Sequence, residues 1–105
     1  MSEPSGGPVP YRVVYPEVVR AALPILAAQA AAAGIGREFL AALKEIDRRL
    51  HIYPQFGDPL TDLAVESGQV RVGTIPPLVV RYALFEERRL VVVAVPPVFL
   101  PRAGL

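Results

Sequence analysis

The sequence predicts an α+β fold. We expect an N-terminal strand, a hairpin of two helices and a three-stranded antiparallel meander, with one face of the sheet packed by the helices. Three observations predict it. Apolar residues recur every three or four positions in the first half of the chain, and the periodicity changes to two after it, with apolar and polar residues alternating over Gln69–Ile75. Between the two helical stretches only the short joint Gly34–Gly36 is available, so these helices must fold back on each other.

Length and composition set the outer limits of the interpretation. The chain has 105 residues, a formal net charge of +1, no cysteine and one histidine. We expect one domain over residues 11–97, a disordered leader over residues 1–10 and a C-terminal tail over residues 98–105. The missing cysteines exclude disulfide frameworks and thiolate chemistry, and one histidine cannot build a multi-histidine metal site. We therefore predict no metal and no cofactor.

The first predicted elements are a short strand and a helix. The stretch Tyr11–Tyr15 is rich in aromatic and β-branched residues, as strands are. Pro16 suits the first position of a helix, and Gly34 is expected to end it. Pro24 is expected on the solvent side, where it kinks the helix at least cost. The bulky residues expected on the buried arc are Val18, Val19, Leu23, Ile25 and Leu26.

A second helix is predicted over residues 37–51. Its apolar side chains are spaced four, three and four positions apart, and its last turn is basic, which suits the negative end of a helix dipole. The apolar side chains of this stripe are Phe39, Leu43, Ile46 and Leu50. The two helices should form an antiparallel hairpin.

The second half of the chain is predicted to be β-structure. Residues 54–68 are expected to connect helix and sheet, with Asp58 capping one short helical turn through Leu63. Gly73 marks a possible bulge. The three strands of the meander are expected at Gln69–Ile75, Leu78–Phe85 and Arg89–Val95.

The last two predicted strands are apolar on both faces, and such strands are normally covered on both sides. Two helices cover only one face. We therefore expect the other face to be covered by the tail Val98–Leu100, by a second copy of the chain or by a different protein. The side chains expected to bind such a partner are Val79, Arg81, Phe85, Val91 and Val93.

Three residues are candidates for catalysis. Arg71 and Arg81 lie within predicted strands, where they either hold phosphates or carboxylates on the open face or pack their stems and reach solvent. His51 has Asp47 one turn before it, so it is either a general base or a surface histidine near a helix end. The apolar stretch 18–33 is interrupted and too short to span a membrane. We expect a cytoplasmic protein without membrane contact.

The order of elements resembles the RelE/ParE family of bacterial type II toxin–antitoxin toxins. The resemblance covers residues 11–95. Several segments carry it: Tyr15-Pro16-Glu17, Phe39-Leu40, Ile46 to Leu50, the stretch Leu50-x-x-x-Pro54-x-x-Gly57-x-Pro59-Leu60-x-x-Leu63, Val70 to Gly73, Val79 to Tyr82, and Leu90 to Val93.

The resemblance implies a sheet packed by two helices on one side and wrapped by an antitoxin segment. It also implies one of two activities: RelE-like members cut mRNA in the ribosome with basic residues and a tyrosine, and ParE-like members inhibit DNA gyrase. The family pattern has an arginine three positions before the tyrosine, where this chain has Val79; Arg81 lies two positions further on.

We therefore expect a toxin or toxin-derived protein that acts mainly through protein–protein contact of its sheet face. One alternative is a ribosome-dependent mRNA endonuclease that uses Arg71, Arg81 and His51. Another is a stand-alone dimerising module without toxicity. The partners implied are a cognate antitoxin or a second copy of the chain, with the ribosome and its mRNA or gyrase as possible targets.

Overall fold

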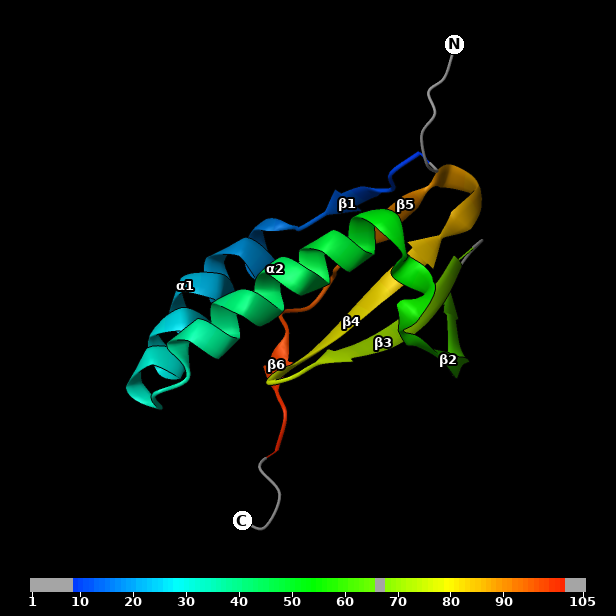
Figure 1. Cartoon of the computed structure of the whole chain (residues 1–105). Coiled ribbons are helices and arrows are strands. Elements are labelled where there is room, and N and C mark those ends of the chain that lie inside the picture. The colour runs from blue at the N-terminus through cyan, green and yellow to red at the C-terminus, as the bar shows by residue number, and fades with distance from the viewer. Residues whose placement is uncertain (1–8, 66–67, 102–105) are drawn as a thin grey trace.

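The computed structural model describes residues 9–65 and 68–101, with the side chains of all of these except 61–65. A helical hairpin lies against one side of a six-stranded mixed sheet (Figure 1). The elements in chain order are β1 (Arg12–Val14), α1 (Glu17–Ala32), α2 (Gly36–Ile52), the 3₁₀ turn η1 (Pro54–Phe56), β2 (Asp58–Val65), β3 (Gly68–Ile75), β4 (Leu78–Phe85), the 3₁₀ turn η2 (Glu86–Arg88), β5 (Leu90–Val92) and β6 (Val98–Phe99).

The strands run in the order β1-β5-β4-β3-β2, and β6 also pairs with β4. The predicted antiparallel meander is confirmed as β3, β4 and β5. The N-terminal strand joins it in parallel, beside β5. The α+β class and the helical hairpin are thus confirmed, but the sheet is larger than the predicted meander because β2 and β6 join it.

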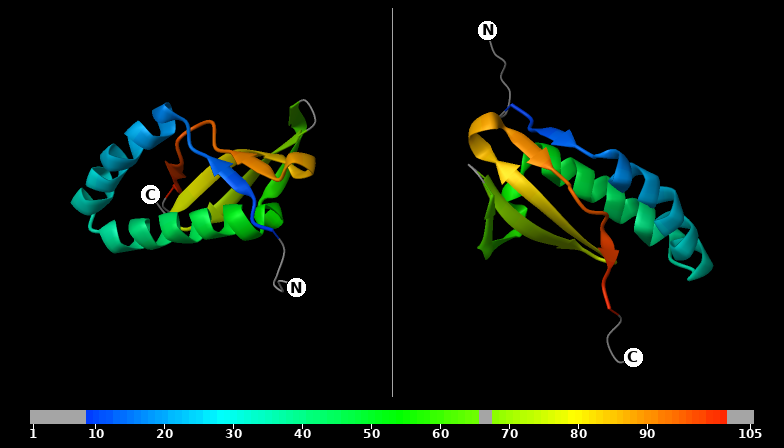
Figure 2. Two further views of the ribbon diagram at one scale, coloured as in Figure 1. Left: turned by 90° about the horizontal axis from the view of Figure 1, so that it is seen from above. Right: turned by 180° about the vertical axis from the view of Figure 1, so that it is seen from behind.

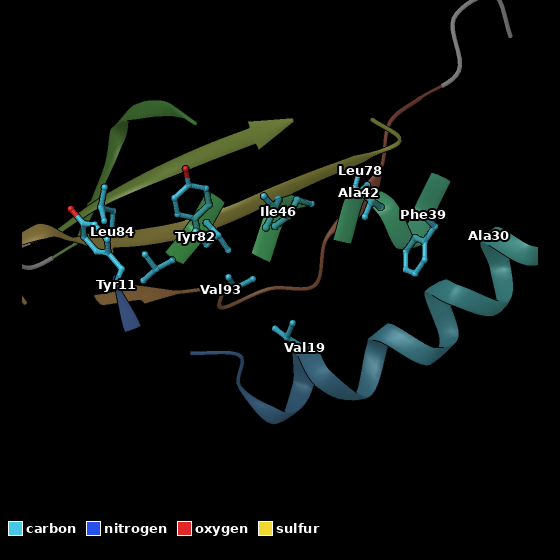
Figure 3. Close-up of a cluster of buried hydrophobic side chains, with 13 residues drawn as sticks. Tyr11, Val19, Ala30, Phe39, Ala42, Ile46, Leu78, Tyr82, Leu84 and Val93 are labelled. Atoms are coloured by element: carbon cyan, nitrogen blue, oxygen red, sulfur yellow. The ribbon is translucent and has the colours of Figure 1, made fainter. Parts of the chain in front are cut away.

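Helix α2 covers the sheet. It lies at a slant to β3 and β4 on the inner side of the sheet (Figure 1). A stripe of its apolar side chains belongs to the buried core. The side chains that it buries are Phe39, Ala42, Ile46 and Leu50. Beneath them lies the inner face of β4, whose buried side chains are Leu78, Val80, Tyr82 and Leu84. Figure 3 shows this core, and we call this side of the sheet the inner face.

Helix α1 packs much less closely. Figure 2 shows it diverging from α2 and standing away from the sheet. Only Val19 and Ala30 are buried along it. Val18 and Ile25, which we expected on the buried arc, are each 61% exposed, so that prediction is wrong. The reason is geometric: α1 contacts the rest of the protein along a narrow line, and its wide apolar arc extends beyond that line.

The predicted helical turn after Asp58 is wrong. Residues 54–56 form η1, and Asp58 begins β2. Asp58 lies opposite Val72 of β3, and the register shifts between Pro59 and Ala64. Helix-capping residues and a proline resemble a turn in sequence, but the open edge of β3 offers a full set of backbone partners, and pairing with that edge decides the conformation.

Gly73 is not a bulge, because β3 and β4 keep a continuous register through it. A Cβ atom at this position would lie 2.5 Å from the ring of Phe56. The glycine therefore allows η1 to pack directly on the inner face.

In the predicted tail, β6 joins the sheet instead of covering its open face, and residues 102–105 lie outside the described part of the chain. Val98 pairs with Val79 at the end of β4, and Phe99 pairs with Leu78. The Phe99 ring turns inward, with its centroid 5.9 Å from that of Phe39. Of the predicted leader, residues 1–8 lie outside the described part of the chain.

Candidate functional site

The face of the sheet opposite the helices is the candidate functional site, and we call it the outer face. Pairing registers identify its members, because directly paired residues project from the same face. Its apolar side chains are Val14, Val70, Val72, Val79, Ala83, Phe85, Leu90, Val92 and Val98. All of these are partly or fully exposed, whereas the inner face of β4 is buried.

The apolar side chains of the outer face form rows across the strands. Phe85 of β4 lies opposite Leu90 of β5, and Ala83 lies opposite Val92. Val70 of β3 extends the second row on the other side of Ala83. Val14 of β1 extends it beyond Val92. The apolar surface is therefore continuous over four strands.

A groove deepens one end of the outer face. It has a volume of about 470 Å³ and is lined by Val72, Val79, Arg81, Val95, Pro96, Pro97 and Val98. Val95 and Val98 on its rim are 43% and 58% exposed. The chain between β5 and β6 forms one wall, so this groove exists because the tail returns to the edge of β4.

Charged side chains of the outer face lie beside the apolar rows. Arg12 lies beside Leu90, and Arg81 lies beside Val72, which in turn lies beside Asp58. Arg12 and Arg81 are both exposed, and within the described residues neither has an ion-pair partner. The guanidinium of Arg88 lies 5.9 Å from the centroid of the Phe85 ring. Arg81 lies on the central strand β4, between the apolar rows and the groove, in the same row as Asp58, and Arg12 lies at the β1 end of the row formed by Phe85 and Leu90.

The residues expected to bind a partner divide between the two faces. Val79, Arg81 and Phe85 belong to the outer face. For Val91 and Val93 the expectation is wrong: they are 0% and 1% exposed and pack in the core under the helices.

The turn between β4 and β5 explains the error. Arg89 follows η2 and adopts the left-handed conformation, with φ of 49°. After this turn Leu90 lies opposite Phe85, so Leu90 and Val92 belong to the outer face. Alternation alone does not distinguish the two sets, because both are apolar, and a shift of one residue exchanges them.

The structure does not bring the three catalytic candidates together. Arg71 lies opposite Tyr82 on the inner face, and Arg81 lies opposite Val72 on the outer face. His51 lies in the last turn of α2, where its Nδ1 is 2.8 Å from the carbonyl oxygen of Asp47. No substrate atom can contact both arginines, because the sheet separates them.

Arg71 instead holds η1 in place. Its guanidinium donates to the carbonyl oxygens of Gln55, at 3.1 Å, and of Gly57. The hydroxyl of Tyr82 donates to the carbonyl of Pro54 at 2.5 Å and accepts from the backbone N–H of Gly57 at 3.1 Å. Burial raises the pKa of Tyr82 to about 12. These bonds satisfy the backbone of a turn that is packed against the core.

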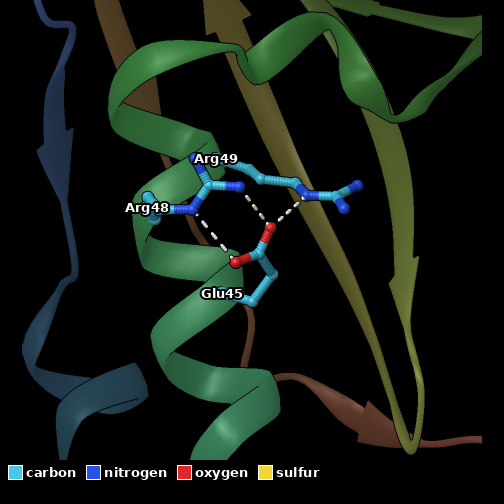
Figure 4. A network of polar contacts seen from close by, with 3 residues as sticks. All are labelled: Glu45, Arg48 and Arg49. Atoms are coloured by element: carbon cyan, nitrogen blue, oxygen red, sulfur yellow. Dashed lines mark hydrogen bonds and ion pairs between the residues drawn. The ribbon is translucent and has the colours of Figure 1, made fainter.

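A second polar network lies on α2 (Figure 4). The carboxylate of Glu45 accepts from Arg48 at 2.6 and 3.0 Å and from Arg49 at 2.6 Å. Hydrogen bonds from Arg48 and then Arg49 lower the pKa of Glu45 to about 2. The guanidinium of Arg49 also lies 5.4 Å from the centroid of the Phe56 ring. These cations are engaged within the helix and with the neighbouring turn.

Two further kinds of site are absent from the described residues. Within residues 9–65 and 68–101, no three acidic, histidine or cysteine side chains gather as metal ligands would. In the same ranges no helix has the length and apolar character needed to cross a membrane.

No family model matches the chain, and neither a curated protein nor a solved structure matches it. The geometry of the outer face is therefore the basis for proposing a function.

Proposed function

We propose that this protein binds a partner protein through the outer face. Given its resemblance to the RelE/ParE toxins, we propose that the partner is the antitoxin of a bacterial type II system and that the chain is a toxin or toxin-derived protein of the cytoplasm. One observation carries the proposal: β4 is apolar on both faces, and in the described structure only the inner face is covered.

The energetic argument concerns the open apolar rows. Removing apolar surface from water contributes about 25 cal/mol per Å². A few hundred Å² is therefore worth several kcal/mol, a quantity comparable to the whole stability of a small domain. Exposed apolar patches of that extent are typical of interaction sites. The return of the tail to the edge of β4 leaves these rows open.

The charges indicate the chemistry of the partner. Arg12 and Arg81 flank the apolar rows, and Arg81 also lines the groove of about 470 Å³. A segment with apolar side chains along one side and carboxylates beside them would fit both features. We propose an acidic, amphipathic segment of the antitoxin as the occupant, with its carboxylates at the two arginines.

No observation favours the nuclease alternative. Cleaving a phosphodiester requires several cations that converge on one phosphate. Arg71 donates to two backbone carbonyls on the inner face, and Arg81 lies on the other side of the sheet. The dimerising module remains as an outcome of the experiment, because a second copy is another protein that could cover the outer face.

The test is co-expression of the full chain with the product of the neighbouring gene, followed by affinity capture and titration calorimetry. Val79→Asp places a carboxylate in the outer-face groove and should abolish complex formation. Val18→Asp is the matched control, because Val18 is exposed on α1, away from the sheet. It should leave the affinity unchanged.

Light scattering on the chain alone decides between partner classes. A monomer that forms a one-to-one complex with the neighbouring product supports the antitoxin proposal. A stable dimer that Val79→Asp dissociates would assign the outer face to a second copy and refute the antitoxin as its occupant. Equal loss of binding in Val79→Asp and Val18→Asp would refute the outer face as the binding surface.

A further inference from the structure

A second cavity lies on the helical side of the molecule, in the space where α1 diverges from α2. Its volume is about 300 Å³. Figure 3 shows three of its wall residues: Val19 on α1, Ile46 on α2 and Val93 after β5. We call it the interhelical pocket, and the residues lining it are Tyr15, Val19, Arg20, Leu23, Leu43, Lys44, Ile46, Asp47, Val80, Val93 and Pro97.

The pocket follows from the weak packing of α1. Val19 reaches the core and is 1% exposed, but Leu23, one turn later, is only half-buried. On the opposite wall Leu43 is also half-buried. The two leucines line one cavity without closing it. An apolar chain between them would supply the contacts that neither helix supplies to the other.

The floor of the pocket is apolar. Its polar groups come from Tyr15, just before α1, and from residues of the two helices. Val80 and Val93 on the floor are 2% and 1% exposed. The hydroxyl of Tyr15 donates to Asp47 Oδ1 at 2.5 Å, and Arg20 donates to Glu17 at 3.0 Å. Asp47 and Arg20, two of the charged lining residues, thus each have a partner within the chain.

Lys44 is the remaining charged lining residue. Within the described part of the chain its ammonium has no ion-pair or hydrogen-bond partner. A ligand group at Lys44 should therefore accept hydrogen bonds, because an ammonium offers three donors and no acceptor, and its positive charge favours an anion.

We propose that the interhelical pocket binds an apolar carboxylate of the medium-chain fatty acid type, with its alkyl chain between α1 and α2 and its carboxylate at Lys44. The pocket is twice the size of a 150 Å³ apolar cavity that holds benzene, and it falls at the lower end of the range for small-molecule sites, about 300–1,000 Å³. The site lies on the helical side of the sheet, so it is independent of the outer face and of the proposed partner.

The test is titration calorimetry of the full chain with decanoate below its micellar concentration. Decanol and decylamine serve as probes of the same chain length. We expect saturable binding of one decanoate per chain. Decanol should bind about tenfold more weakly, because it lacks the charge-assisted hydrogen bond to Lys44, and decylamine should not bind measurably.

Two variants locate the site. Leu43→Trp fills the pocket and should abolish binding, and Leu40→Trp is its matched control because Leu40 is 55% exposed on α2 and does not line the pocket. Lys44→Gln changes only a surface group, so it keeps the test valid if Leu43→Trp fails to fold. Lys44→Gln should reduce the affinity for decanoate about tenfold and leave the affinity for decanol unchanged. Lys44→Arg keeps the charge and should retain most of the affinity for decanoate.

Each outcome decides the proposal. No saturable binding of decanoate would overturn it. Equal loss in Leu43→Trp and Leu40→Trp, with both variants folded, would place the ligand elsewhere and overturn the site. Equal affinity for decanoate and decanol, unaffected by Lys44→Gln, would overturn the carboxylate.

Discussion

The two faces of β4 have almost the same apolar character in sequence, but one is buried in the structure and the other is partly exposed to solvent. On the inner face Leu78, Val80, Tyr82 and Leu84 are no more than 2% exposed. On the outer face Val79, Ala83 and Phe85 remain partly exposed, and Arg81 is exposed. The difference comes from what lies above each face. Helix α2 and η1 cover the inner one, and the described chain leaves the outer one open.

This comparison shows how far burial depends on distant parts of the chain. A strand specifies which residues share a face, but the neighbouring elements decide which face becomes the core. The predictions below test this contrast, first by matched changes on the two faces of the sheet and then by changes in the elements that cover the inner face, in order of decreasing effect.

The largest effect is expected from a carboxylate on the inner face. Leu84→Asp places a charge in a site that is 2% exposed, and it removes apolar contacts at the same time. Replacing a buried leucine by alanine already costs about 2–5 kcal/mol, and an unpaired charge costs more, so this variant should not fold. Circular dichroism on heating should show no cooperative transition.

The matched change on the outer face is Phe85→Asp, one residue further along β4. Phe85 is only half-buried, so this variant should fold and should melt cooperatively, with a modest loss of stability. If both variants unfold, the outer face is part of the core, and the contrast between the faces is wrong.

The second effect separates the two strand arginines. Arg71→Met removes the donor to Gln55 and Gly57 and leaves two partly buried carbonyls without this partner, which should cost about 1–3 kcal/mol. Arg81→Met changes an exposed side chain and should alter stability by no more than about 0.5 kcal/mol. Urea unfolding of both variants measures the difference. Equal destabilisation would show that Arg81 is also a structural residue.

The third effect concerns the hydroxyl of Tyr82. Tyr82→Phe keeps the packed ring but leaves the Gly57 N–H and the Pro54 carbonyl unpaired, at a cost of about 1–3 kcal/mol in urea unfolding. Tyr53→Phe is the control, because Tyr53 is 58% exposed. A Tyr82→Phe protein as stable as the control would show that these bonds contribute nothing.

Tyr82 also predicts a loss of stability at alkaline pH. Its pKa is raised from 10.0 to about 12 in the folded protein. The unfolded chain therefore releases this proton first, so the contribution of Tyr82 is full below pH 10 and is lost as the pH rises toward 12. The pKa of Tyr15 is raised as well, by burial and by Asp47. Tyr82→Phe should therefore remove part of the alkaline loss and Tyr15→Phe another part.

Much of the fold was predictable because its signals are local. The spacing from Phe39 to Leu50 and the glycines at 34 and 36 fixed the second helix and the hairpin to within a residue or two. The strands β3 and β4 were predicted at nearly their observed bounds. Element β2 was missed because its conformation depends on pairing with β3, which is not a local property.

The candidate site was less predictable for the same reason. Sequence alternation identified two apolar faces, and it placed Val79, Arg81 and Phe85 on one of them. Which residues of β5 face outward depends on Arg89, which adopts the left-handed backbone conformation. An arginine in the sequence does not predict that conformation. Arg71 looked like Arg81 in sequence, and only the packing of η1 on the inner face distinguishes them.

The smallest effect is expected on the solvent side of α2, the helix that covers the inner face. Glu45→Gln removes the carboxylate that pairs with Arg48 and Arg49, and these side chains are all partly exposed to solvent, which screens the pairs, so the loss of stability at neutral pH should be slight. The pKa of Glu45 is lowered from 4.5 to about 2 in the folded protein. Its contribution is therefore full above pH 4.5 and is lost as the pH falls toward 2. Urea unfolding at pH 7 and pH 2.5 should show a small difference between the two proteins that shrinks at the lower pH and in high salt. A large, salt-independent difference would mean that α2 is held over the sheet by its ion pairs, whereas the contrast between the two faces requires that its apolar stripe holds it.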